Sequence, residues 1–96
     1  MDVIHQYTGT FPAGYQKVDL TGADVVALPT GTSRLVLQCE IGDIRWRDDG
    51  RVADADNGML LLADDPPRDY LTRATELNVF GTATLHVSAY RDTNNG

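Results

Sequence analysis

The sequence predicts an all-β fold, a compact antiparallel β-sandwich or jelly-roll-like barrel of about seven or eight short strands. The first observation is that nine glycines and four prolines recur along the chain, too often for long helices. The second is that no window of a dozen residues carries apolar side chains at helical spacing. The third is that several short segments alternate between apolar and polar residues, as strands do. A chain of 96 residues is long enough for one such domain.

Two segments carry the clearest strand pattern. Residues 33–39 place Leu35, Leu37 and Cys39 on one face of a strand. Residues 82–90 place four apolar side chains on one face, and Thr84, His86, Ser88 and Tyr90 on the other. This alternation predicts that the apolar face of each strand lies in the core. The apolar face of the second strand comprises Ala83, Leu85, Val87 and Ala89.

Weaker patterns predict further strands at residues 15–20, 25–28, 43–47, 58–63 and 77–80. In the third of these, Ile44 and Trp46 point the same way and are expected in the core. Residues 58–63 are apolar throughout, which predicts a strand covered on both faces. We expect polar connections at residues 47–58 and 64–69, because they are rich in turn-forming Asp, Asn, Gly and Pro.

The domain organisation follows from these segments. Residues 1–91 are expected to form a single β-sandwich domain, within which residues 1–15 form an extended N-terminal arm. Residues 92–96, which are polar and contain no strand pattern, are expected to form a flexible tail.

Charge and composition exclude several functions. The chain has 14 acidic and 8 basic side chains, a net charge of −6 and a pI near 4.5. This charge repels phosphate backbones and anionic lipids, so neither nucleic acid nor a membrane is an expected partner. The N-terminus lacks the features of a signal peptide, and the single cysteine, Cys39, cannot form an internal disulfide. We therefore expect assembly in a reducing compartment.

No catalytic residue is predicted, and the chain is not expected to be an enzyme. The two imidazoles are His5, near the N-terminus, and His86, on the polar face of a strand. A surface role explains His86 better than a catalytic one, since no partner nucleophile stands at a recognisable spacing. Cys39 alternates with Leu35 and Leu37 on the apolar face of its predicted strand, so we interpret it as a small core residue.

The sequence contains no recognisable motif for a cofactor or a metal ion, and none is predicted. No two Cys or His residues have the spacing of a zinc site. Calcium remains open for residues 48–57, where Asp48, Asp49, Asp54, Asp56 and Asn57 gather oxygen ligands. The loop does not match an EF-hand, and two Asp–Gly-type turns explain the same residues.

The segment Arg45, Trp46, Arg47 is the most unusual local cluster. Trp46 could serve as a sugar-stacking platform or an interface anchor. Its alternation with Ile44 favours a core position instead. The two arginines then face outward, where guanidinium groups suit pairing with carboxylates at a subunit contact.

Three segments together resemble a group of small virion proteins of tailed bacteriophages. They read LVLQCEIGDIRWRDDG (35–50), GMLLLADDPPRDY (58–70) and GTATLHVSAYR (81–91). The group's pattern is similar to LQ-x-E-x-GDIR-[WY]-RDDG, then GMLL-x-A-x-E-P-x-x-Y, then GT-x-TLNVSYYR. The resemblance covers residues 33–91 in the same order. This chain departs from the pattern at Asp65, His86 and Ala89, where the group has Glu, Asn and Tyr.

The resemblance implies a non-enzymatic structural protein of the virion, assembled in the cytoplasm of the bacterial host. We expect a capsid decoration or cement protein that forms a homo-oligomer, a dimer or trimer, and binds the major capsid protein or other virion proteins. The alternative is a carbohydrate- or protein-binding module of the phage neck or tail, with Trp46, Tyr70 and Tyr90 as stacking platforms. The interface candidates are Arg45, Arg47, Phe11, Tyr15 and Tyr90.

Overall fold

The computed structural model describes residues 11–92, and these residues form an all-β structure without a helix. The strands are β1 (Phe11–Ala27), β2 (Thr32–Glu40), β3 (Ile44–Arg47), β4 (Met59–Leu61), β5 (Arg68–Leu71) and β6 (Glu76–Arg91). The predicted all-β class is confirmed. The positions of residues 1–10 and 93–96, which include His5 and most of the expected arm and tail, lie outside the described residues.

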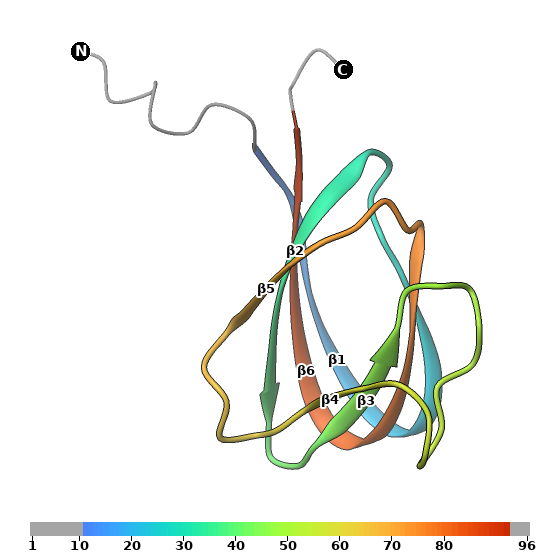
Figure 1. Cartoon of the computed structure of the whole chain (residues 1–96). Coiled ribbons are helices and arrows are strands. Elements are labelled where there is room, and N and C mark those ends of the chain that lie inside the picture. Colours follow the sequence, from blue (N-terminus) through green and yellow to red (C-terminus); the bar gives the residue numbers. More distant parts are fainter. Residues whose placement is uncertain (1–10, 93–96) are drawn as a thin grey trace.

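Two long strands, β1 and β6, form the frame of the molecule. They pair antiparallel along almost their whole length, from Phe11 opposite Arg91 to Ala27 opposite Glu76. Both strands bend sharply, so that each has the shape of a U (Figure 1). At the bend Gly22 lies opposite Gly81, and both glycines have positive φ. Glycine therefore allows the strands to turn without interrupting their pairing.

The other strands add to the free edge of β6. β2 pairs with residues 84–91 of β6 and β3 with residues 78–81, while β5 extends β2 and β4 extends β3. The result is one strongly curled antiparallel sheet, or half-barrel (Figure 1). Neither the expected sandwich or jelly-roll-like barrel nor the expected seven or eight strands is confirmed, because residues 11–92 contain six strands in one sheet.

The core lies inside the curl of the sheet. The predicted apolar faces of residues 33–39 and 82–90 are both buried, as are Ile44 and Trp46. The fully buried leucines come from three different strands, β2, β4 and β6, so strands far apart in the sequence contribute to one core. They are Leu35, Leu37, Leu61, Leu77 and Leu85.

Three expectations about the strands need correction. Residues 15–20 and 25–28 fall largely in one strand, β1, and residues 77–80 and 82–90 fall in β6, because glycine bends each strand where a break was expected. Residues 58–63 are not covered on both faces: Leu61 is buried, but Leu60 is 51% exposed because the strands form a single sheet whose outer face has no second layer over it. The predicted polar connection at residues 64–69 overlaps a short edge strand, β5, for which no strand was predicted.

The last residues of the expected arm, residues 11–15, belong to the sheet. Phe11 and Tyr15 lie in β1, which is paired with β6 from Phe11 onward. The register shifts between Pro12 and Gly14, which marks a β-bulge.

Candidate functional site

The five interface candidates fall in two separate groups. Arg45 and Arg47 lie on β3, opposite Phe80 and Asn78 of β6. The other three lie at the far arm of the sheet, where β1 begins and β6 ends. The structure therefore does not combine all five into one site. The second group comprises Phe11, Tyr15 and Tyr90.

Arg45 holds the long loop between β3 and β4. Its Nε donates to the carbonyl oxygen of Ala55 at 3.1 Å, and its Nη1 donates to that of Gly58 at 3.0 Å. The same loop places Ala53, which is fully buried, outside the core cluster. Arg45 is thus part of the structure of the loop, since its guanidinium satisfies carbonyl groups that no strand pairs.

Arg47 pairs with Asp49, two residues along the chain. The guanidinium donates from Nε and Nη2 to the two carboxylate oxygens, a bidentate geometry that suits arginine. This hydrogen bond lowers the pKa of Asp49 and raises that of Arg47. Arg47 therefore pairs with a carboxylate of its own chain, whereas Arg45 binds backbone carbonyl groups. Pairing of these arginines at a subunit contact stays a prediction.

The acidic residues of the 48–57 loop act as turn formers. Asp54 accepts hydrogen bonds from the backbone N–H of Asp56 and of Asn57, and from the side chain of Asn57. The backbone hydrogen bond from Asp56 is the main cause of the lowered pKa of Asp54. Asp48 accepts a hydrogen bond from the Thr72 hydroxyl. In residues 11–92, no group of three or more His, Cys, Asp or Glu side chains is arranged to hold a metal ion.

Trp46 is a core residue, as its alternation with Ile44 predicted. Its side chain is 5% exposed, and its ring packs edge-on against Tyr70, with the ring centroids 4.5 Å apart. A buried ring cannot stack on a sugar, so this structure offers Trp46 no role as a carbohydrate platform. Tyr70, which packs against Trp46, is half-buried, so only part of its ring is open to a ligand.

Tyr90 lies beneath an arginine that the sequence analysis did not single out. Arg34 of β2 is its direct neighbour in the sheet, and the Arg34 guanidinium carbon lies 4.4 Å from the centre of the Tyr90 ring. Arg34 also pairs with Asp69 of β5. The cation–π contact and the ion pair both tie neighbouring strands together.

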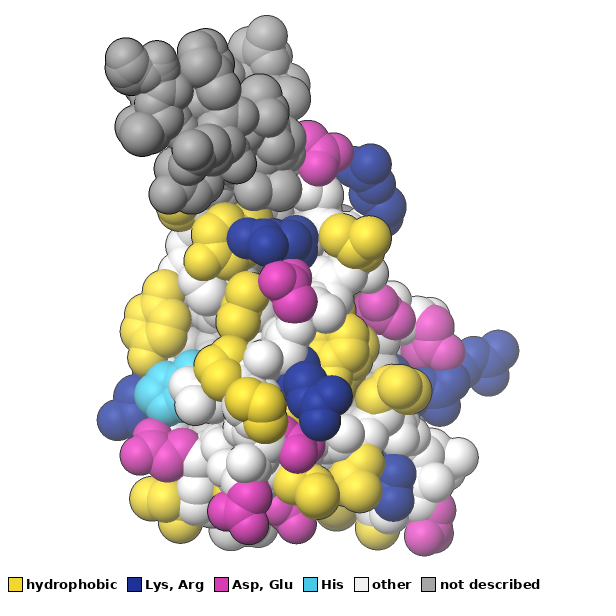
Figure 2. Space-filling model, turned by 60° about the vertical axis from the view of Figure 1, so that its left-hand side comes forward, with side chains coloured by type: hydrophobic (Ala, Val, Ile, Leu, Met, Phe, Trp, Pro, Cys, Tyr) yellow, Lys and Arg dark blue, Asp and Glu magenta, His cyan; other side chains and the backbone are white. Residues whose placement is uncertain are grey.

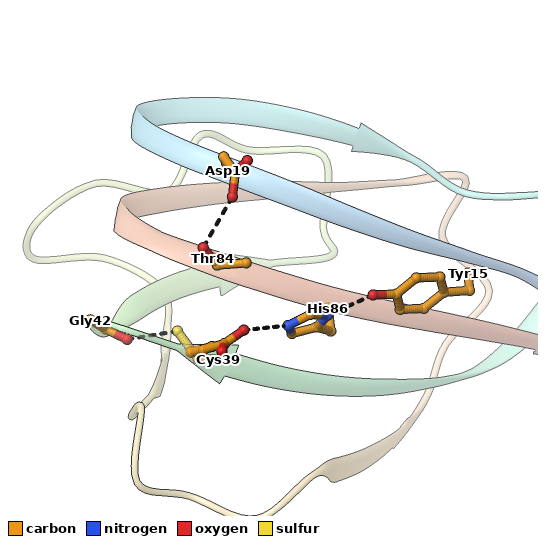
Figure 3. Close-up of polar contacts among 7 residues, drawn as sticks. Tyr15, Asp19, Cys39, Gly42, Thr84 and His86 are labelled. Carbon is orange, nitrogen blue, oxygen red and sulfur yellow. Dashed lines mark hydrogen bonds and ion pairs between the residues drawn. The ribbon is translucent and has the colours of Figure 1, made fainter.

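His86 connects three neighbouring strands (Figure 3). The Tyr15 hydroxyl of β1 lies 2.7 Å from His86 Nδ1, and His86 Nε2 lies 2.9 Å from the Glu40 carboxylate of β2. A neutral imidazole with its proton on Nε2 satisfies both contacts. Sequence reasoning interpreted His86 as an ordinary surface residue, because only the strand register brings Tyr15 and Glu40 to it.

An open hollow of about 500 Å³ adjoins this cluster, lined in part by Glu40, Ile41, Asp64 and His86. Cys39 also borders it, but its thiol donates to the carbonyl oxygen of Gly42 at 2.8 Å. Burial raises the pKa of the Cys39 thiol, so the group stays protonated and is a poor nucleophile. The predicted core position of Cys39 is confirmed, since the residue is buried.

Exposed hydrophobic side chains are spread over several elements. On the face shown in Figure 2, they lie among charged side chains and do not form one continuous patch. The most exposed large ones are Tyr15, Ile41, Val52, Met59 and Leu71. An apolar docking face of the kind found in obligate complexes is therefore not visible from this side.

Two glycines of the resembling segments, Gly42 and Gly81, mark close approaches of the backbone. A Cβ at Gly42 would lie 2.2 Å from the carbonyl oxygen of Thr82, and a Cβ at Gly81 would lie 2.5 Å from that of Asp43. The turn after β2 and the bend of β6 thus fit together only without side chains. These segments carry residues that shape the fold: Gly42 and Gly81 at backbone contacts, Arg45 and Arg47 bonded to the loop that follows β3, and Trp46 against Tyr70.

Comparison of the chain with protein-family models, curated proteins and solved structures finds no significant match. Within residues 11–92, no helix is long and apolar enough to span a membrane.

Proposed function

We propose that this chain is an accessory structural protein of a bacteriophage virion. It acts as a decoration or cement protein that forms a homo-oligomer and binds the major capsid protein or other proteins of the assembled head. Its place of assembly is the cytoplasm of the bacterial host. The proposal assigns it no catalytic activity and no cofactor.

The proposal rests on the structural roles of residues in the segments that resemble phage virion proteins. Gly42 and Gly81 allow a backbone contact, Arg45 fixes a loop, and Trp46 packs on Tyr70. All are roles in holding a rigid sheet together. A motif of this kind supports a structural function, because catalytic motifs place reactive side chains in a cleft instead.

The arrangement of polar groups also supports a structural role. The contacts of Arg47, Asp54 and His86 join neighbouring segments within the chain. Such contacts rigidify the surface that a capsid lattice would contact, and a rigid surface loses little entropy on binding.

The test is quantitative mass spectrometry of purified phage particles, with heads and tails separated before digestion. The proposal predicts that peptides of this chain occur in the head fraction at a fixed ratio to the major capsid protein. Recovery in the tail fraction alone would favour a binding module of the neck or tail. Absence from both fractions would contradict a virion role.

A further inference from the structure

The outer edge of β1 is the longest strand edge that stands open in the structure. β1 has 17 residues and pairs with β6 on one side. Among residues 11–92, no strand pairs with its other side. In Figure 3, β1, β6 and β2 follow one another in that order. An open edge of this length is a template for adding another strand.

The register of β1 fixes which backbone groups face outward. The N–H of Leu28 donates to Thr75, in line with the pairing of Ala27 and Glu76. Residues of an antiparallel strand alternate between bonding the partner and facing away. The register runs without a shift from Gly14 to Ala27. Odd-numbered residues of β1 therefore turn their N–H and C=O groups to the open edge.

Both ends of this edge are closed by the chain itself. The carbonyl oxygen of Ala27 accepts a hydrogen bond from the Gln16 side chain, and the N–H of Val25 donates to the Asp24 carboxylate. At the other end, a bulge lies between Pro12 and Gly14. These devices block strand addition, so the stretch open to a partner is residues 15–23.

We propose that a second copy of this chain occupies this stretch, through antiparallel pairing of β1 with β1 about a two-fold axis at Val18. The proposal specifies the contact behind the self-association that the proposed function includes, and it rests on that part of the function. In this register Lys17 faces Asp19 of the second copy, and Tyr15 faces Thr21. Four such residue pairs form about eight backbone hydrogen bonds.

Charge complementarity selects the partner and the register. The side chains of Lys17 and Asp19 are both exposed, and Thr84 donates to the Asp19 carboxylate at 3.0 Å, which orients it. The two-fold axis at Val18 gives two opposite-charge pairs, which stabilise neighbouring strands. A shift of the axis by one residue places Lys17 against Lys17 or Asp19 against Asp19. Both alternatives oppose like charges.

The first test is the molar mass of the purified full chain in solution, by light scattering after gel filtration, at concentrations on the order of 0.1 mM. The proposal predicts a dimer. Lys17→Asp and Asp19→Lys each oppose like charges and should weaken association at least tenfold. The double variant Lys17→Asp/Asp19→Lys restores both pairs and should dimerise again, as should an equimolar mixture of the two single variants. Circular dichroism verifies that each variant is folded.

The matched control is Arg51→Asp, which makes the same change in net charge on the exposed loop. It should leave the dimer intact. A monomeric or trimeric wild-type chain would overturn the proposal, as would dimerisation that the single charge reversals do not weaken. Either result would leave the virion assignment standing, because particle composition is measured separately.

A second test needs no variant. Lys17 is the only lysine of the chain, so a carbodiimide can join its amine directly to a carboxylate that it contacts. In a mixture of ¹⁴N- and ¹⁵N-labelled chains, a cross-link between Lys17 of one isotope and Asp19 of the other is expected. Cross-links confined to chains of one isotope would contradict the proposed contact.

Discussion

Trp46 and Tyr70 pack edge to face, with ring centroids 4.5 Å apart, although their strands share no ladder. Trp46 lies on β3 and Tyr70 on β5, at the two flanks of the curled sheet. A hydrogen bond from Thr72 to Asp48, 3.1 Å long, joins the same two regions. The open side of the half-barrel is therefore closed by side chains and not by backbone pairing.

Replacing Tyr70 with Ala should open this side. We expect Tyr70→Ala to lower the free energy of unfolding by about 2 kcal/mol or more, since it removes an aromatic pair and leaves a cavity. The fluorescence of Trp46, the only tryptophan, should shift to longer wavelength as water reaches the ring. Urea unfolding and emission spectra measure both effects.

The control for this variant is Leu71→Ala, at the neighbouring residue, which is 83% exposed. It should change neither the stability nor the emission maximum. An equal effect at both positions would show that the contact between Trp46 and Tyr70 does not close the sheet.

Substitutions at Gly22 and Gly81, which face each other, distinguish the effect of backbone conformation from the effect of close packing. Both have positive φ, but a Cβ at Gly22 meets no atom within 4 Å, whereas one at Gly81 lies 2.5 Å from the Asp43 carbonyl oxygen. Gly22→Ala should cost about 1–2 kcal/mol of stability through strain alone. Gly81→Ala should cost clearly more, and thermal unfolding of the two variants measures the difference. Equal midpoints would contradict the close approach.

Local alternation was sufficient to predict the buried faces of β2 and of residues 82–90 in β6. The faces that carry Leu35, Leu37 and Leu85 follow from a period of two, which depends on residues close in sequence. The local pattern did not predict that two expected strands would be continuous in β1, and two others in β6. A glycine such as Gly81 ends a strand in most contexts, and here the neighbouring strand β1 bends in parallel with it.

Contacts between distant residues could not be read from the sequence. Tyr15, His86 and Glu40 meet because β1, β6 and β2 pair in one particular register. β5 was missed because it is only four residues long, begins with two charged residues and follows two prolines. Such a composition is typical of turns, but an exposed edge strand also tolerates it.

Truncation of the core should unfold this small domain. Leu37→Ala and Leu85→Ala each remove a fully buried side chain, and each should cost about 2–5 kcal/mol. Small domains have little stability to spare, so we expect partial unfolding at room temperature. Arg51→Ala, in the exposed loop, should change the stability little. Chemical denaturation compares the three, and similar small losses at all sites would show that the buried faces are assigned wrongly.

The stability of the loop at residues 48–57 should depend on acid. The pKa of Asp49 is lowered chiefly by its hydrogen bond from Arg47, and that of Asp54 by the backbone N–H of Asp56. A lowered pKa in the folded state means that the contribution is present above the unfolded value, about 4, and is lost as the pH falls through the folded value. Carboxyl ¹³C shifts followed during an acid titration should give midpoints below the usual range for both residues. Ordinary midpoints would contradict these contacts.

The most direct test of the central claim, that this curled sheet serves as a structural component of the phage head, is electron cryomicroscopy of the parent particle. The account predicts repeated density on the head lattice into which residues 11–92 fit as a rigid curled sheet. A head map without such density, for a particle that contains the chain, would contradict the claim.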